Sequence, residues 1–247
     1  MQQTAYLAAL VERVRSVLGP ALTGVYAGGS FALGGYERPR SDLDVAVVVN
    51  SPLALEEKEA LVRALRHEAL PCPARGLELV VYTEEAVRRP SADAAFELNL
   101  NTGRAMDFRA DFEPVPGELH WFAIDRGVLH AHGVVLAGPP AAEVFADPGS
   151  ALLVPLLAET LRWCLADGAG AEAVLAACRA LRYAEEGVWS SKASAARWAK
   201  SRVEDGALVE KALRARSVGD TVDPSSAVSF VETALVRLDA GAPPRTA

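Results

Sequence analysis

The sequence is short of several features that would each define a class of protein. It has 3 cysteines in 247 residues. Cys72, Cys164 and Cys178 are scattered without metal-ligand spacing, which indicates reduced thiols. No uncharged apolar stretch approaches the roughly 20 residues that a transmembrane helix needs, and Met1–Gln3 does not open a basic-then-apolar targeting signal. We therefore expect a cytoplasmic protein without a membrane partner.

Positive charge is also in short supply. Lys and Arg total 25 against 32 Asp and Glu, which leaves a formal net charge of -7. An acidic chain lacks the positive charge that binds nucleic-acid phosphates independently of sequence, so we expect no nucleic-acid partner. The same charge suits a cationic small molecule, and it also serves simple solubility. Hydrophobic residues make up 51% of the chain, which is enough to form a core. We also expect the protein to be a monomer.

The residue pattern changes character near residue 148. Before that point, apolar positions switch between helical spacing, in 4–18 and 55–70, and short strand-like runs, in 22–27, 43–49 and 77–82. Strands and helices in alternation predict an α/β domain. Beyond a connector rich in Gly and Pro, helices are expected near 151–166, 171–186, 191–204, 207–216 and 224–239. The pattern thus predicts two domains, 1–148 and 149–247.

Three acidic residues in the first domain form the candidate active site. Asp42 and Asp44 are two apart at the start of an apolar strand, so their side chains point to the same face. Glu78 is the second residue of a later apolar run and can join them from a neighbouring strand. Carboxylates gathered in an apolar sheet repel one another. A divalent cation relieves that repulsion, and Mg²⁺ favours one or two carboxylates plus substrate phosphates, so we assign it to Asp42 and Asp44.

A glycine-rich turn precedes these acids. Gly28 and Gly29 follow a short strand and let the backbone approach a triphosphate closely, and the Ser30 hydroxyl can donate to its oxygens. Each short motif alone is common in turns and at strand ends. The ordered combination of a strand, Gly28-Gly29-Ser30, Ser41-Asp42-Leu43-Asp44 and a later strand carboxylate indicates binding of a nucleoside triphosphate.

The stretch from Gly28 to Asp44 resembles the signature of the polymerase β-like nucleotidyltransferase superfamily. Five further stretches are similar to the streptomycin and spectinomycin adenylyltransferases, the aminoglycoside (3'')(9) adenylyltransferase group: Phe96-Glu97-Leu98, 138–145, 178–183, Ser191-Lys192 and 195–199. The similarity extends from about Gly24 to Val203. It implies an α+β fold, in which an α/β-type nucleotidyltransferase domain with a mixed sheet is followed by an all-α helical-bundle domain that completes the ATP and acceptor site.

The resemblance also implies a role for each matching residue. The triphosphate of ATP would be held by Gly29, Ser30, Ser41, Arg179 and Lys192. Asp42 and Asp44 would hold Mg²⁺, and Glu78 would be the general base on the acceptor hydroxyl. The implied reaction is Mg²⁺-dependent transfer of AMP from ATP to a hydroxyl of an aminoglycoside or spectinomycin-type antibiotic, with release of pyrophosphate.

The acceptor-binding residues of that group are less well matched. The tryptophan that it carries after Phe-Glu-Leu corresponds to a position near Gly103. The aspartate that it places about three helical turns before the arginine falls near Ala169, with Asp167 and Glu172 close by. The acceptor therefore stays open. Six acids are candidates to bind a cationic one: Glu97, Asp107, Asp111, Asp167, Glu185 and Glu186.

Two other functions stay open at this level. The chain could transfer a nucleotide to a protein or an RNA, although its acidic charge and its lack of a basic tract count against RNA. It could also be a non-catalytic nucleotide-binding regulator of the same fold, but such a protein has little use for Glu78.

Overall fold

The computed structural model describes residues 3–38, 40–114, 120–218 and 220–241. The chain divides into two compact units, Met1–Pro148 and Gly149–Ala247, which we call unit 1 and unit 2. The elements of unit 1 are α1 (Gln3–Leu18), the 3₁₀ helix η1 (Gly19–Ala21), β1 (Leu22–Ala27), α2 (Gly29–Ala32), β2 (Leu43–Val49), α3 (Leu55–Leu65), β3 (Leu77–Thr83), α4 (Glu84–Val87), β4 (Phe96–Gly103), β5 (Met106–Asp111), α5 (His120–His132), β6 (Val134–Ala137) and α6 (Ala141–Val144). Those of unit 2 are α7 (Ser150–Gly168), α8 (Ala171–Glu186), α9 (Lys192–Ala199), α10 (Gly206–Val218) and α11 (Pro224–Asp239).

The described part of unit 1 is built on a six-stranded sheet with the order β5-β4-β3-β2-β1-β6. β2 and β3 pair in parallel, and the other neighbouring strands pair antiparallel. Two parallel strands need a crossover connection, and the segment that contains α3 supplies it. The expected mixed sheet is therefore confirmed, and its parallel pair sets the two strand starts side by side.

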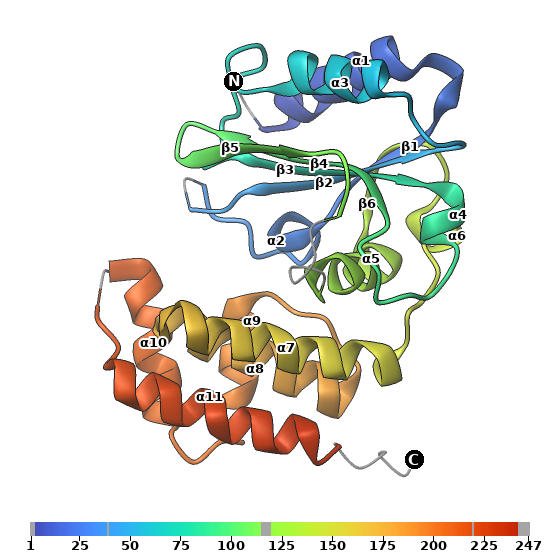
Figure 1. Cartoon of the computed structure of the whole chain (residues 1–247). Helices are drawn as coiled ribbons and strands as arrows, with labels where there is room; N and C mark the ends of the chain where they lie inside the picture. Colours follow the sequence, from blue (N-terminus) through green and yellow to red (C-terminus); the bar gives the residue numbers. More distant parts are fainter. Residues whose placement is uncertain (1–2, 39, 115–119, 219, 242–247) are drawn as a thin grey trace. The chain divides into compact units, whose positions relative to one another are not determined.

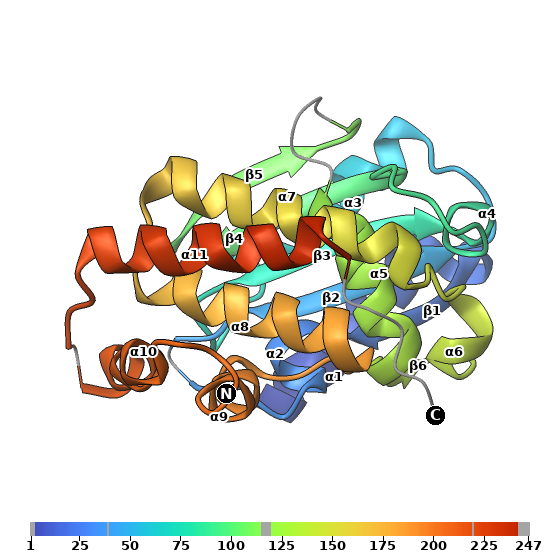
Figure 2. The ribbon, with the colours of Figure 1, turned by 90° about the horizontal axis from the view of Figure 1, so that it is seen from below.

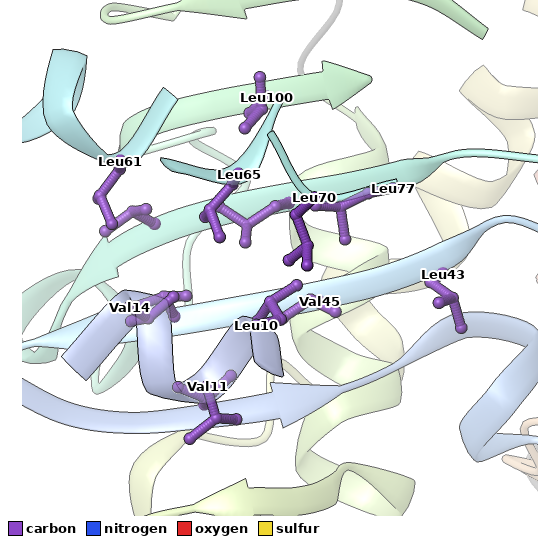
Figure 3. Close-up of a cluster of buried hydrophobic side chains, with 14 of the residues drawn as sticks. Leu10, Val11, Val14, Leu43, Val45, Leu61, Leu65, Leu70, Leu77 and Leu100 are labelled. Atoms are coloured by element: carbon purple, nitrogen blue, oxygen red, sulfur yellow. The ribbon is translucent and has the colours of Figure 1, made fainter. Parts of the chain in front are cut away.

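Helices cover both faces of the sheet (Figure 1). On one face, leucines and valines of the strands pack against α1 and α3, as Leu10, Leu61 and Leu77 show (Figure 3). On the other face, Tyr26 of β1 and Phe122 of α5 belong to a second apolar core, which also includes α6. Strand side chains alternate between faces. The second core does not extend to the first residues of β2 and β3, where its face carries polar side chains instead.

Unit 2 is helical over its described residues. α7, α8 and α11 lie side by side (Figure 2), and α9 and α10 pack against α8. α8 ends at Gly187, whose φ of 66° is a left-handed conformation that favours glycine. The Ser191 side chain caps α9 and the Asp223 side chain caps α11, each by accepting a backbone N–H of the first turn. The expected all-α second part is confirmed. In the described ranges of the chain, no helix combines the length and the apolar character needed to cross a membrane.

Two expected helices are shorter in the structure. α3 ends at Leu65 instead of near residue 70, because Arg66 leaves the helical conformation and the His67 amide donates to Thr102 Oγ1 at 2.8 Å. Leu70 is buried although it is not helical, and its spacing extended the helical pattern. Likewise α9 covers only Lys192–Ala199 of the expected 191–204, and turns follow it.

Candidate active site

Asp44 and Glu78 lie beside each other at the start of the two parallel strands. Their Cα atoms are register partners in the β2–β3 pair, and partnered residues of a sheet point to the same face. Leu43 and Leu77, one position earlier on each strand, belong to the core on the opposite face. The half-buried carboxylates of Asp44 and Glu78 therefore lie on the face that carries the second apolar core. They stand at the start of the two strands, which that core does not reach.

The turn between β1 and α2 brings its glycines against Asp44. Gly28 donates its N–H to the Asp44 carbonyl at 2.9 Å. Gly29 has a φ of 49°, and a Cβ at this position would lie 1.8 Å from Asp44 Oδ2, so the position requires glycine. Ser30 Oγ is buried and has no hydrogen-bond partner among the described residues. The turn thus presents an unused hydroxyl and the first amides of α2, which have no partner within the helix.

Ser41 and Asp42 occupy the approach to β2. The Ser41 amide donates to the Glu37 carbonyl at 2.8 Å, and Ser41 Oγ accepts the Glu37 amide at 2.9 Å. The buried serine thereby closes a turn and keeps its own hydroxyl hydrogen for a ligand. Asp42 Oδ2 lies 3.4 Å from Arg75 Nη1. Because the arginine is exposed, this pair is weak and can yield to another cation.

The pKa of the Glu78 carboxyl is far above its usual value. Burial raises its pKa to about 8, and the negative charges of Asp44 and Asp42 add to the rise. Asp125, an exposed residue of α5, raises the pKa as well, whereas Arg75 lowers it. Asp125 was not expected from the sequence. Its one signal is that it is the only acid in the largely apolar stretch 121–129.

These side chains fit a magnesium ion. In the part of the chain that the structure describes, no group of three or more His, Cys, Asp or Glu side chains forms a complete metal site. Asp42 and Asp44 would offer two carboxylates, and Mg²⁺ in nucleotide sites takes its remaining ligands from phosphates and water. The unused Ser30 hydroxyl and the bare Gly29 backbone can accommodate such phosphates beside Asp44.

Arg179 and Lys192 belong to unit 2, where Lys192 is part of a charged cluster. Lys192 Nζ at the start of α9 lies 2.5 Å from Glu172 Oε2 of α8, and Arg216 Nη1 of α10 lies 3.1 Å from Glu172 Oε1. Glu172 therefore joins three helices. Asp167 adds a second negative charge nearby, since Lys192, Asp167 and Glu172 all act on the pKa of Cys164. Arg179 is half-buried on α8.

Most of the acids considered for a cationic acceptor already have a cationic partner. Four of the six form ion pairs: Glu97 with Lys58, Asp111 with Arg109, Glu186 with Arg182, and Glu185 with Arg237. Asp107 and Asp167 are exposed. Neutralised carboxylates attract an ammonium group weakly, so a simple acidic lining does not explain acceptor binding.

Unit 2 also contains a cavity of about 620 Å³, lined by α8, α11 and the segment 202–208. None of the predicted site residues line it. Two of the polar side chains that line it make hydrogen bonds to the nearby backbone: Asp205 accepts the Leu208 amide at 2.8 Å, and Thr233 Oγ1 donates to the Ser229 carbonyl at 2.9 Å. The predicted site residues therefore lie outside this cavity.

Two family models match the chain. The model described as "Nucleotidyltransferase domain" matches residues 7–101, and the model described as "Aminoglycoside adenylyltransferase, C-terminal domain" matches residues 154–237. The first range contains Gly29, Asp44 and Glu78, and the second lies in unit 2. No curated protein matches the sequence.

One solved structure has the same fold over nearly the whole chain. Spectinomycin adenyltransferase AAD(9) from Enterococcus faecialis, crystallised with ATP and spectinomycin, matches 96% of this chain and 100% of its own chain, with a TM-score of 0.71 and 15% sequence identity. At that identity the likeness establishes the fold. A toxin–antitoxin crystal structure with AMP-PNP matches 64% of this chain and 89% of its own, at a TM-score of 0.31 and 16% identity, which is too low to support an argument.

The fold and the first family match define an enzyme class: the chain is a nucleotidyltransferase. Its helical second unit narrows that class, because the C-terminal family model matches there. The two family matches and the fold together support an aminoglycoside adenylyltransferase group.

Proposed function

We propose that this enzyme transfers AMP from ATP, with Mg²⁺, to a hydroxyl of a small cationic acceptor of the aminoglycoside or spectinomycin type. One observation carries the proposal: the Gly29 backbone, the Asp44 carboxylate and the Glu78 carboxylate are direct neighbours on one face of the sheet. In this proposal a phosphate-binding turn, a metal-binding acid and a base would stand in one line. The ATP and spectinomycin bound to AAD(9), which has the same fold, support the choice of substrates.

Backbone and side-chain donors would bind the triphosphate. In unit 1, the Gly29 backbone and the hydroxyls of Ser30 and Ser41 would donate to phosphate oxygens. Arg179 and Lys192 of unit 2 are the further phosphate-binding residues that the resemblance implies.

Asp42 and Asp44 would hold the magnesium ion. When bound, Mg²⁺ would polarise the α-phosphate, balance charge on the leaving pyrophosphate and offset the aspartate charges that raise the Glu78 pKa. Glu78 would accept the proton of the acceptor hydroxyl as its oxygen bonds to the α-phosphorus. The bond from that phosphorus to the bridging oxygen of the β-phosphate breaks, and pyrophosphate leaves with the electron pair.

The deciding experiment measures pyrophosphate release from ATP and Mg²⁺ with a panel of aminoglycosides and spectinomycin. We expect release that depends on one acceptor and is lost in Asp42→Asn. Glu78→Gln should still bind ATP but lose turnover by at least about a hundredfold. Glu56→Gln, which changes an exposed glutamate of α3, is the matched control. If ATP binds but no member of the panel supports pyrophosphate release, the proposal of an antibiotic acceptor is wrong. Transfer of AMP to a protein or an RNA is then the hypothesis to test. Full turnover by Glu78→Gln would exclude this residue as the base.

A further inference from the structure

The polar face of the sheet continues past Glu78. Glu78 is the register partner of Asn101 on β4, and Asn101 is the partner of Arg109 on β5. With Asp44, these residues form a row of four polar side chains across β2, β3, β4 and β5. Leu100, next to Asn101, belongs to the core on the opposite face (Figure 3). Neighbours in such a row are roughly 5 Å apart at their Cβ atoms.

The order of this row gives the reaction a direction. The glycine turn lies on the β1 side of Asp44, because Gly28 bonds to the Asp44 carbonyl. In an in-line displacement the attacking and leaving oxygens lie on opposite sides of the phosphorus. With the triphosphate on the β1 side, the acceptor approaches Glu78 from the β4 side. The first residue that it meets beyond Glu78 is Asn101.

The Asn101 side chain differs from its polar neighbours because it has no hydrogen-bond partner among the described residues. Its half-buried carboxamide makes no hydrogen bond within the described residues, whereas Asn99, two residues earlier on the same face, donates to Asp111 Oδ2 at 3.1 Å. Arg109 Nε donates to the same oxygen at 2.6 Å. The Asn99–Asp111–Arg109 network is thus complete by itself, and an unused amide stands between the proposed base and an arginine.

We propose that Asn101 is a specificity-determining residue that binds a second oxygen of the acceptor, on the ring carbon next to the one that carries the modified hydroxyl. The proposal rests on the proposed function, since it takes Glu78 as the base. A carboxamide donates to a hydroxyl or ether oxygen and accepts from a hydroxyl. Oxygens on adjacent ring carbons can reach two neighbouring side chains of one row.

The charge around Asn101 restricts the acceptor further. Arg109 is paired with Asp111, so the side chains beyond Asn101 offer no net negative charge to bind an ammonium group. The acceptor class is therefore a cyclic polyol whose reactive hydroxyl has an oxygen as its neighbour on the β4 side. Cationic substituents of such a molecule would lie on its other edges. This differs from recognition by an aromatic ring, for which the chain has only Gly103 at the expected position.

The test compares two acceptors in two variants. Wild type, Asn101→Leu and the control Asn99→Leu are assayed with spectinomycin and with a deoxy analogue that lacks the oxygen beside the modified hydroxyl. We expect wild type to lose roughly tenfold in kcat/KM on the analogue, because the amide is then left unsatisfied. Asn101→Leu should act on both acceptors with the kcat/KM that wild type has on the analogue, and the loss on spectinomycin should come mainly from a higher KM. Asn99→Leu should keep the tenfold preference for spectinomycin. A tenfold preference that survives in Asn101→Leu overturns the proposal.

A second measurement works without turnover. The side-chain amide of Asn101 is assigned in a nitrogen-15 NMR spectrum by its absence in Asn101→Leu, and spectinomycin is added to the wild-type enzyme. We expect this resonance to shift on saturation, while that of Asn50, held by Pro20, does not. If no product forms in any assay, the proposed reaction fails, yet the amide shift still decides whether Asn101 binds the acceptor. A bound acceptor that leaves the Asn101 resonance unmoved refutes the assignment.

Discussion

Replacing Glu78 with glutamine should change how the stability of unit 1 depends on pH. In the folded state the pKa of Glu78 is raised from 4.5 to about 8. A raised pKa means that protonated Glu78 favours the folded state; this contribution is complete below about pH 4.5 and is lost as the pH rises through about 8. Full linkage at ~1.4 kcal/mol per pKa unit amounts to about 5 kcal/mol. Because the side chain is only half-buried, we expect about 2–3 kcal/mol.

The assay is urea denaturation of wild type, Glu78→Gln and Glu56→Gln at pH 5, 7 and 9, with a chelator and without nucleotide. Relative to wild type, Glu78→Gln should gain about 2–3 kcal/mol in unfolding free energy between pH 5 and pH 9. Unit 2 is identical in the three proteins, so its transition cancels in the difference. Glu56→Gln should follow wild type at every pH. If the Glu78→Gln and wild-type curves run parallel, the Glu78 carboxyl is not destabilised in the folded protein, and the argument from burial is wrong.

Three further substitutions test individual contacts. Gly29→Ala should abolish ATP binding and destabilise unit 1 by about 2 kcal/mol more than Gly34→Ala in thermal unfolding, because both have positive φ but only Gly29 faces the Asp44 carboxylate; equal effects would count against the close approach. Lys192→Met should weaken ATP binding several-fold by titration calorimetry, whereas Glu172→Gln should leave it unchanged or tighter; a loss in Glu172→Gln alone would assign Lys192 a purely structural role. Arg126→Met should cost about 3 kcal/mol in urea denaturation, because the buried guanidinium donates to three carbonyls of the segment 91–94; a near-neutral result would mean that water replaces it.

Much of the fold follows from local patterns. The nearly continuous apolar runs at 43–49 and 77–82 predict strands buried on both faces, and the structure has β2 and β3 there. The helices of unit 2 follow from apolar spacing and from caps such as Ser191 and Asp223. β4, β5 and α5 were not expected, although the alternation of apolar and polar residues over 96–101 is typical of a half-buried strand.

The sequence by itself determined which residue types were available and that Asp42 and Asp44 stand two residues apart, where β2 begins. Only the tertiary structure decided that Glu78 stands opposite Asp44, because strand register depends on how the two apolar faces pack. It also decided that Gly29 touches Asp44, that Asp125 adds its charge from α5, and that Lys192 pairs with Glu172. These contacts join residues far apart along the chain, and no local pattern encodes them because they arise from the packing of whole elements.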